Sequence, residues 1–119
     1  MTPKQQEVRK QWVEALRSGK YEKCVGRLKH YDMSTRYCCL GVLCELAAKE
    51  NIVTAGLNSF DGQINYLPLA VQNWVGLRTN DGLPNGIDVD DEALAKLNDN
   101  GRTFLALADI IESDDRYFV

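Results

Sequence analysis

The sequence predicts one α+β domain that is mostly helical, with a buried central helix and one or two short β-hairpins. Residues 38–48 are apolar on nearly every side, as expected of a helix that is surrounded by protein. Helical periodicity fades between residues 21 and 40, where two strand-like segments flank a turn. The 119 residues, 45% of them hydrophobic, can fill one modest core and would leave two cores incomplete. Residues 1–119 are therefore expected to form a single domain.

An amphipathic helix is predicted over residues 4–17. Its apolar side chains fall largely on one side of the helix, with Lys, Gln, Arg and Glu on the other. The apolar residues are Val8, Trp12, Val13, Ala15 and Leu16. The pair Ser18-Gly19 supplies a natural end to this helix.

Two segments favour β-structure. Residues 25–28 and 35–38 are predicted to be short strands around a turn, which makes a β-hairpin. The later stretch, residues 53–66, is interrupted by glycine and by Asn and Asp residues. It is expected to form a second short hairpin or an irregular loop, with Phe60 and Ile64 turned inward.

The central helix is predicted near Cys39–Lys49, and Glu45 is the one charged residue within its apolar block. Gly41 lies near the start of this helix. A missing side chain there would let another backbone segment approach closely, at some cost to helix stability.

A short helix is expected after Leu67, because Pro68 is well tolerated at a first helical position. This helix should end at Gly76, and its inward stripe comprises Val71, Trp74 and Val75.

Two more helices are expected in the C-terminal part. Asp88 or Asp90 can cap a helix that runs to about Leu97. Thr103 caps, or nearly caps, a last helix that runs to Ile111. The inward residues are Leu94 and Leu97 in the first of these helices, and Phe104, Leu107, Ala108 and Ile111 in the second.

Charge and hydropathy exclude several classes of protein. The formal net charge is -3, so the chain has no global attraction to a polyanion, and bulk binding of DNA or RNA is disfavoured. No apolar run approaches membrane-spanning length, and the N-terminus lacks the pattern of a signal peptide. A cytoplasmic location is expected, where Cys24, Cys38, Cys39 and Cys44 would be reduced thiols in the core.

Motifs for catalysis, metals and cofactors are weak. The cysteine spacing fits no familiar zinc module, and residues 81–92 match a calcium loop only in part because Leu83 occupies a ligand position. The one nucleophile and base pairing that suggests itself is Cys38 with His30, if the hairpin brings them together at the helix start. Buried core thiols are the preferred interpretation, so no catalytic residue, metal site or cofactor is assigned.

Planar and cationic side chains in expected loop or hairpin positions form the candidate ligand site. Arginine binds phosphate with two parallel hydrogen bonds, while an aromatic face stacks on a base. The candidates are Arg27, Arg36, Tyr37, Trp74, Arg78 and Arg102. For each residue alone, the structural alternative is a core aromatic, as for Trp74, or a solvated arginine.

Three blocks of sequence resemble a family of small proteins from tailed phages, prophages and some bacteria that usually carry no assigned function. The most specific block is Tyr37-Cys38-Cys39-Leu40-Gly41-Val42-Leu43-Cys44-Glu45-Leu46-Ala47. The others are Leu67-Pro68-x-x-Val71-x-x-Trp74-Val75-Gly76-Leu77 and Leu97-Asn98-Asp99-x-Gly101-x-x-Phe104-x-x-Leu107-Ala108-x-x-Ile111. The resemblance also includes Trp12, Leu16-Arg17-Ser18-Gly19-Lys20-Tyr21 and Gly26-x-Leu28, so it spans nearly the whole chain. It supplies a biological context without catalytic residues.

That context implies a binding protein with a phage-type anti-defence role. Small phage accessory proteins often bind an immune signalling nucleotide or a host protein, and some do so as homo-oligomers, which the sequence leaves open here. The favoured expectation is sequestration of a cyclic or ADP-ribose-like nucleotide in the host cytoplasm. The alternatives are an inhibitor of a host protein, with residues 116–119 as its exposed apolar patch, and a cysteine-dependent enzyme. Fold or context analogy supports all three only by association.

Overall fold

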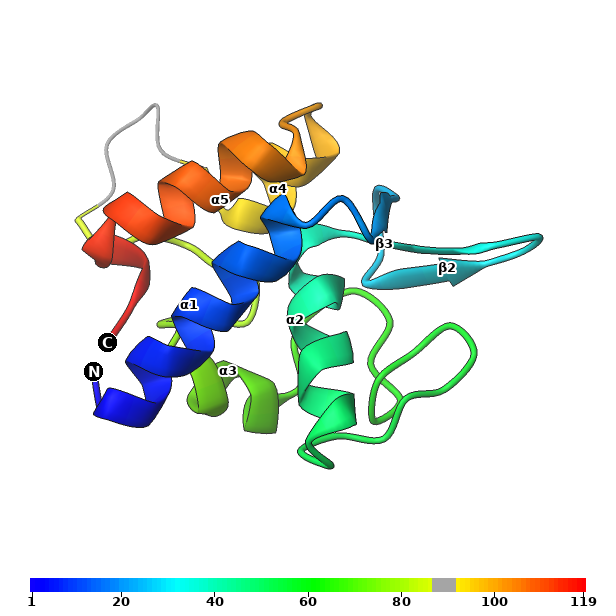
Figure 1. Ribbon diagram of the computed structural model, residues 1–119, viewed down its shortest axis with the longest axis horizontal. Helices are drawn as coiled ribbons and strands as arrows, with labels where there is room; N and C mark the ends of the chain where they lie inside the picture. The colour runs from blue at the N-terminus through cyan, green and yellow to red at the C-terminus, as the bar shows by residue number, and fades with distance from the viewer. Residues whose placement is uncertain (87–91) are drawn as a thin grey trace.

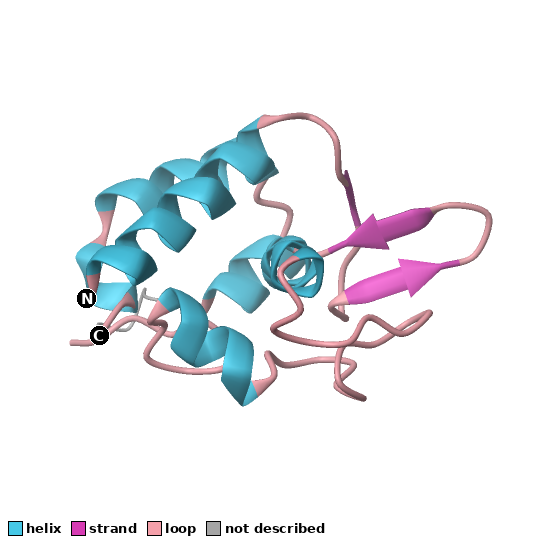
Figure 2. Cartoon of the chain, turned by 60° about the horizontal axis from the view of Figure 1, so that its bottom comes forward, coloured by secondary structure: helices cyan, strands magenta, loops and turns pink. Residues whose placement is uncertain are grey.

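The computed structural model describes residues 1–86 and 92–119 of the chain. Within these residues the fold is α+β, with five α-helices, three short strands and a C-terminal 3₁₀ turn (Figure 1). The elements are α1 (Pro3–Arg17), β1 (Glu22–Lys23), β2 (Lys29–Tyr31), β3 (Thr35–Tyr37), α2 (Cys39–Lys49), α3 (Leu69–Val75), α4 (Leu94–Asp99), α5 (Phe104–Ser113) and η1 (Asp115–Tyr117). Figure 2 looks nearly along α2, with the other helices on one side and the strands on the other.

The N-terminal helix forms where the sequence predicts it. Thr2 caps α1 through a bond from the Gln5 amide, and the Gln5 side chain accepts a bond from the Thr2 amide in return. The buried face of α1 packs along α5 (Figure 1). Its buried residues are Val8, Trp12, Val13 and Leu16. Trp12 also donates its indole N–H to the carbonyl of Cys39 over 2.9 Å, which ties α1 to the start of α2.

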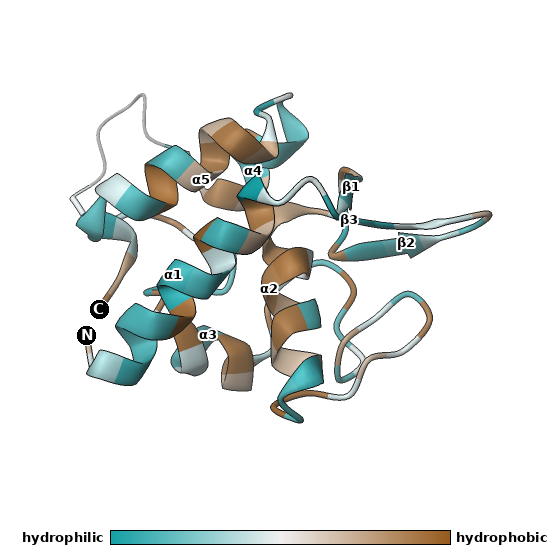
Figure 3. Cartoon of the chain, in the orientation of Figure 1, coloured by the Kyte–Doolittle hydropathy of each residue, from teal (hydrophilic) through white to brown (hydrophobic). Residues whose placement is uncertain are grey.

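The central helix is confirmed as the core element. All of its first six residues, Cys39 through Cys44, are buried, as is Ala47, and Figure 3 shows α2 as mainly hydrophobic. The backbone of Leu28 lies directly against Gly41. The close backbone approach expected at this glycine is therefore present.

A β-hairpin is present, but its first strand lies further along the chain than residues 25–28. Gly26 has a φ of 78°, and Val25 is 56% exposed, so that segment turns outward instead of pairing. The antiparallel pair is β2 with β3, and His30 lies opposite Arg36. The two-residue strand β1, which the sequence did not predict, pairs in parallel with β3 to give the order β1-β3-β2.

Residues 53–66 form an irregular loop with isolated bridges at Phe60 rather than a regular hairpin. Phe60 is buried, as expected. The prediction that Ile64 turns inward is wrong, because Ile64 is 51% exposed. Ile64 is attached through its backbone: its carbonyl accepts a bond from the Leu28 amide over 2.8 Å. The loop thereby covers the backbone that leads into β2.

The short helix α3 starts one residue later than expected. Pro68 is its N-cap rather than its first helical residue, and Gly76 ends the helix in the left-handed conformation with a φ of 82°. Val71 and Val75 are buried, whereas Trp74 is half-buried against the core.

The helix expected after Asp88 or Asp90 begins only at Leu94, with Ala93 as its N-cap; both aspartates lie outside the described residues. Thr103 caps α5 as predicted, through a bond from the Ala106 amide. Helix α5 extends two residues beyond the predicted end at Ile111.

The C-terminal segment is part of the core, which overturns its interpretation as an exposed apolar patch. Tyr117 and Phe118 are buried. The Val119 amide donates to the carbonyl of Gly76, and the Arg78 amide donates to the carbonyl of Tyr117. The segment therefore closes against the residues that follow α3. Across the described helices, none combines the length and the apolar character that a bilayer crossing requires.

Candidate functional site

Two of the six candidate residues, Arg27 and Arg36, line the same pocket. This basic pocket has a volume of about 310 Å³ and is bordered by the loop after β1 and by strands β2 and β3. It is lined by Lys23, Cys24, Val25, Arg27, His30 and Arg36. Four of these six side chains are basic residues, and none is acidic.

The hairpin register positions the basic side chains. His30 and Arg36 are direct cross-strand partners, so their side chains project from the same face of the sheet. Nη1 of Arg27 lies 3.2 Å from Nδ1 of His30. Since arginine can only donate, Nδ1 is the acceptor in this contact, and the other ring nitrogen, Nε2, lies 3.5 Å from the Asp32 carboxylate.

Asp32 partly balances the charge at one edge of the basic pocket. Its carboxylate lies 3.3 Å from the Arg36 guanidinium. Backbone bonds from Met33 and Ser34, and then the positive charge of Arg36, hold the pKa of Asp32 below its usual value. Asp32 thus remains ionised at neutral pH and orients Arg36.

Arg27 and Lys23 have no such partner. Among the described residues, no carboxylate lies within ion-pair distance of either side chain, and Lys23 Nζ instead donates to the carbonyl of Arg102 over 2.7 Å. The positive charges of Arg36 and Arg27 both favour the ionised form of Cys24, although burial raises the pKa of that thiol overall. Both guanidinium groups are therefore near enough to Cys24, in the pocket lining, to influence its ionisation.

A second, larger pocket of about 470 Å³ shares Arg27 with the basic pocket. We call it the adjoining pocket. It is lined by Gly26, Arg27, Cys38, Asn65, Tyr66, Asp81, Ala93, Ala95, Lys96 and Asp99. In contrast to the basic pocket, it combines two carboxylates with two cations and an exposed tyrosine ring.

Each carboxylate of the adjoining pocket is held in place through hydrogen bonding of one of its two oxygens. Oδ1 of Asp99 accepts a bond from the Gly26 amide over 2.9 Å. Oδ1 of Asp81 accepts a bond from the Thr79 hydroxyl over 2.6 Å. No residue in the described part of the chain donates to either Oδ2 atom.

Asn98 anchors the walls of both pockets and is fully buried. Its side-chain oxygen accepts a bond from the Cys39 amide over 3.1 Å, and its Nδ2 donates to the carbonyl of Cys24 over 3.0 Å. Asn98 thereby connects α4, the start of α2 and the loop after β1. Asn98 lies within the third of the three sequence blocks, where no local pattern indicates this role.

The remaining four candidates lie outside both pockets. Tyr37 packs edge-on against Tyr21, with ring centroids 5.5 Å apart, and burial together with Glu45 raises the pKa of Tyr37 to about 12. Trp74 packs against the core from α3. Arg78 and Arg102 are exposed, and Arg102 reaches the basic pocket only through the carbonyl that holds Lys23.

Sequence reasoning missed Lys23, Tyr66 and Asp99 as site residues, and it considered His30 only as a partner for a thiol. The available signal was the density of basic residues in the segment from Lys23 to His30. That signal does not show which of these side chains converge, because convergence depends on the strand register.

The thiols are arranged for packing. The described chain leaves all four cysteines free and buried. Burial raises the pKa of Cys38 to about 12, although its sulfur accepts a bond from the Gly41 amide at the helix start. Among the described residues, His30 contacts Arg27 and Asp32, and no hydrogen bond joins it to Cys38, the pairing that the sequence offered as an alternative to buried core thiols.

Metal binding finds no support in the part of the chain that the structure describes, where no three His, Cys, Asp or Glu side chains are placed to share an ion. The partial calcium motif over residues 81–92 includes residues 87–91, which lie outside the described ranges. Within those ranges, its first position, Asp81, is bonded to Thr79.

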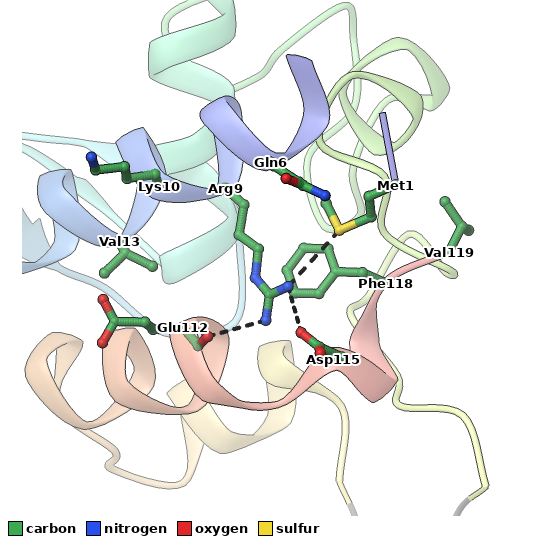
Figure 4. Close-up of a pocket in the computed structure, with 9 residues that line it drawn as sticks. All are labelled: Met1, Gln6, Arg9, Lys10, Val13, Glu112, Asp115, Phe118 and Val119. Carbon is green, nitrogen blue, oxygen red and sulfur yellow. Dashed lines mark hydrogen bonds and ion pairs between the residues drawn. The ribbon is translucent and has the colours of Figure 1, made fainter. Parts of the chain in front are cut away.

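A further cavity, of about 520 Å³, lies between α1 and the C-terminal segment (Figure 4). Its arginine, Arg9, is already engaged: it donates to the carbonyl of Ile111 and to the Asp115 carboxylate, each over 2.8 Å. Its guanidinium also lies 4.1 Å from the centre of the Phe118 ring. This arrangement fastens α1 to the C-terminal segment, so we assign the cavity a structural role.

Comparison with known proteins adds a family and no activity. No curated protein and no solved structure matches the chain. The family model described as a domain of unknown function (DUF8296) matches residues 4–115. The matched range contains both pockets and nearly all of the core. Because the match covers almost the whole chain, the protein belongs to the DUF8296 family.

Proposed function

We propose that this protein binds and sequesters a small phosphorylated signalling nucleotide, of the cyclic or ADP-ribose-like type, in a phage-type anti-defence role. The observation that carries the proposal is the convergence of Lys23, Arg27, His30 and Arg36 on one pocket. The chain as a whole is acidic, with a net charge of -3, so this cluster is a local feature. A local basic pocket selects a small anion where the global charge disfavours a polyanion.

Arg27 and Lys23 are the residues that a phosphate would contact first. Both lack an ion-pair partner among the described residues, so a phosphate need not displace a carboxylate to reach them. A guanidinium can donate two parallel hydrogen bonds to phosphate. Arg36, oriented by Asp32, adds a second guanidinium to the lining of the same pocket.

Binding without turnover is supported by the state of the thiols. The one sulfur on the wall of the basic pocket is Cys24, and burial raises its pKa. Cys38, on the wall of the adjoining pocket, is also held as a thiol. A protonated thiol is a weak nucleophile, so the ligand is expected to leave unchanged.

Isothermal titration calorimetry with ADP-ribose and with a cyclic dinucleotide tests the proposal. Arg27→Gln and Arg36→Gln should each weaken binding by about tenfold or more, because each removes a charge-assisted contact to phosphate. Arg78→Gln and Arg102→Gln are matched controls, since both side chains are exposed and lie outside the pockets. Mass spectrometry of the released ligand should show an unchanged mass.

The proposal fails if neither nucleotide binds at near-physiological salt, or if the control variants weaken binding as much as Arg27→Gln does. A changed mass of the released ligand would replace sequestration with turnover.

Binding of a host protein is the second candidate, because exposed apolar side chains gather at the hairpin. Met33, in the β2–β3 turn, is 98% exposed. Tyr31 and Leu57 are also exposed, and the Tyr31 amide donates to the side chain of Asn58, which follows Leu57. If this surface binds a host protein, Met33→Ser should abolish capture of that protein while Arg27→Gln leaves it intact.

A further inference from the structure

We infer that the adjoining pocket holds the nucleoside part of the ligand, so that the ligand class is a nucleoside phosphate and not a phosphate or phosphosugar alone. This inference rests on the proposed function, because it takes the basic pocket as the phosphate site. The two pockets are linked by Arg27, which lines both. One ligand can therefore contact both pockets across a single side chain.

The charges of the two pockets divide the ligand into an anionic part and a neutral part. The basic pocket has no acidic residue in its lining. The adjoining pocket contains Asp81 and Asp99 together with Arg27 and Lys96, so its acidic and basic side chains balance. A ligand that extends from the basic pocket is therefore expected to place its uncharged, hydrogen-bonding portion in the adjoining pocket.

The same carboxylates select a portion that is rich in hydrogen-bond donors. Each aspartate is fixed through Oδ1, by Thr79 for Asp81 and by Gly26 for Asp99. Each Oδ2 receives no bond from the described residues and can accept one from a ligand. Ribose hydroxyls and the amino groups of bases are donors of this kind.

Tyr66 supplies a surface for a planar ring. Its residue is 52% exposed at the adjoining pocket, so part of its ring is available to a base without movement of the core. Ala93 and Ala95 add small apolar walls. A base stacks on an aromatic ring and also packs well against methyl groups.

The volumes agree with this division. The adjoining pocket, at about 470 Å³, is larger than the basic pocket, at about 310 Å³. Both fall in the range of roughly 300–1,000 Å³ that is typical of small-molecule sites. The larger volume is thus assigned to the nucleoside and the smaller one to the phosphates.

The test compares ADP with inorganic pyrophosphate, because the two probes share a diphosphate group and differ in the nucleoside. Wild-type protein should bind ADP at least about tenfold more tightly, through the stacking and hydrogen bonds of the nucleoside. Tyr66→Ala should remove most of that advantage and leave pyrophosphate affinity unchanged. Arg27→Gln should weaken the binding of both probes. Tyr31→Ala, which changes an exposed tyrosine outside both pockets, is the matched control and should change neither.

Asp81→Asn provides a second variant that keeps the size of the side chain and removes its charge. This substitution should weaken the binding of ADP without weakening the binding of pyrophosphate. The inference is overturned if wild-type protein binds both probes equally and Tyr66→Ala and Asp81→Asn change neither affinity; the proposed function would survive that result. If ADP, ADP-ribose, a cyclic dinucleotide and pyrophosphate all fail to bind, the proposed function and the inference fall together.

Discussion

The carbonyl oxygen of Leu28 lies so close to Gly41 that a Cβ atom built on Gly41 would stand 1.7 Å from it. The same carbonyl accepts a bond from the Cys38 amide over 3.2 Å. The chain that leads into β2 is thereby pressed onto the first turn of α2. Arg27, the residue shared by the two pockets, directly precedes this contact.

Gly41→Ala should destabilise the protein, although alanine is the better helix former. In an exposed helix the change would add about 1 kcal/mol to the free energy of unfolding. Here the methyl group meets backbone atoms that cannot rotate away, so we expect a loss of about 2 kcal/mol or more. Urea unfolding followed by circular dichroism measures the difference. An increase in stability would contradict the close approach.

Asn98→Ala should also cost stability, because it leaves the Cys39 amide and the Cys24 carbonyl without their partner. Each unsatisfied buried group costs roughly 1–3 kcal/mol, so a loss of about 3 kcal/mol in the free energy of unfolding is expected. Asn100→Ala is the control, since the Asn100 side chain is exposed and bonds only to Glu92 among the described residues. Equal effects of the two variants would contradict the role assigned to Asn98.

Local signals explain why the helices were predictable. Thr103 caps α5 through its own hydroxyl, and the apolar spacing of α1 specifies its buried face. Strand β1 lacks such a signal, because its two residues form a strand only through pairing with β3. Ile64 shows the same limit: its hydrophobicity predicted burial, yet the loop is fixed by its backbone bond to Leu28.

The candidate site was predictable in part. Residue chemistry identified Arg27 and Arg36, because arginine suits phosphate. Their convergence with Lys23 depends on the parallel pairing of β1 and β3. The carboxylate of Asp99 joins the adjoining pocket because α4 lies beside the loop after β1, to which Asn98 and Asp99 are both hydrogen-bonded. These are tertiary relationships that no local pattern specifies.

The buried thiols should make stability fall at alkaline pH. Burial raises the pKa of Cys38 from its ordinary 9.0 to about 12, and it raises the pKa of Cys44 as well. Between these values the unfolded chain releases protons that the native state retains, so the unfolded state binds fewer protons and stability decreases as pH rises. Each such thiol contributes a slope of up to about 1.4 kcal/mol per pH unit.

Urea unfolding at pH values between about 8 and 10.5 measures this slope. Lys and Tyr also titrate in this range, so the comparison is with Cys44→Ala, which removes one buried thiol and should flatten the decline. An identical slope for the wild type and Cys44→Ala would show that the Cys44 thiol does not carry a raised pKa in the folded protein.

Phe118→Ala should destabilise the fold, because the ring is buried and packs against Arg9. Truncation of a buried phenylalanine costs about 3–5 kcal/mol. Val119→Ala is the control: its side chain is exposed, and substitution there should change stability by less than about 0.5 kcal/mol. Thermal unfolding of the two variants makes the comparison. If Phe118→Ala has the melting temperature of the wild type but no longer binds a partner protein, the C-terminal segment is a binding surface. The core role assigned to Phe118 would then be wrong.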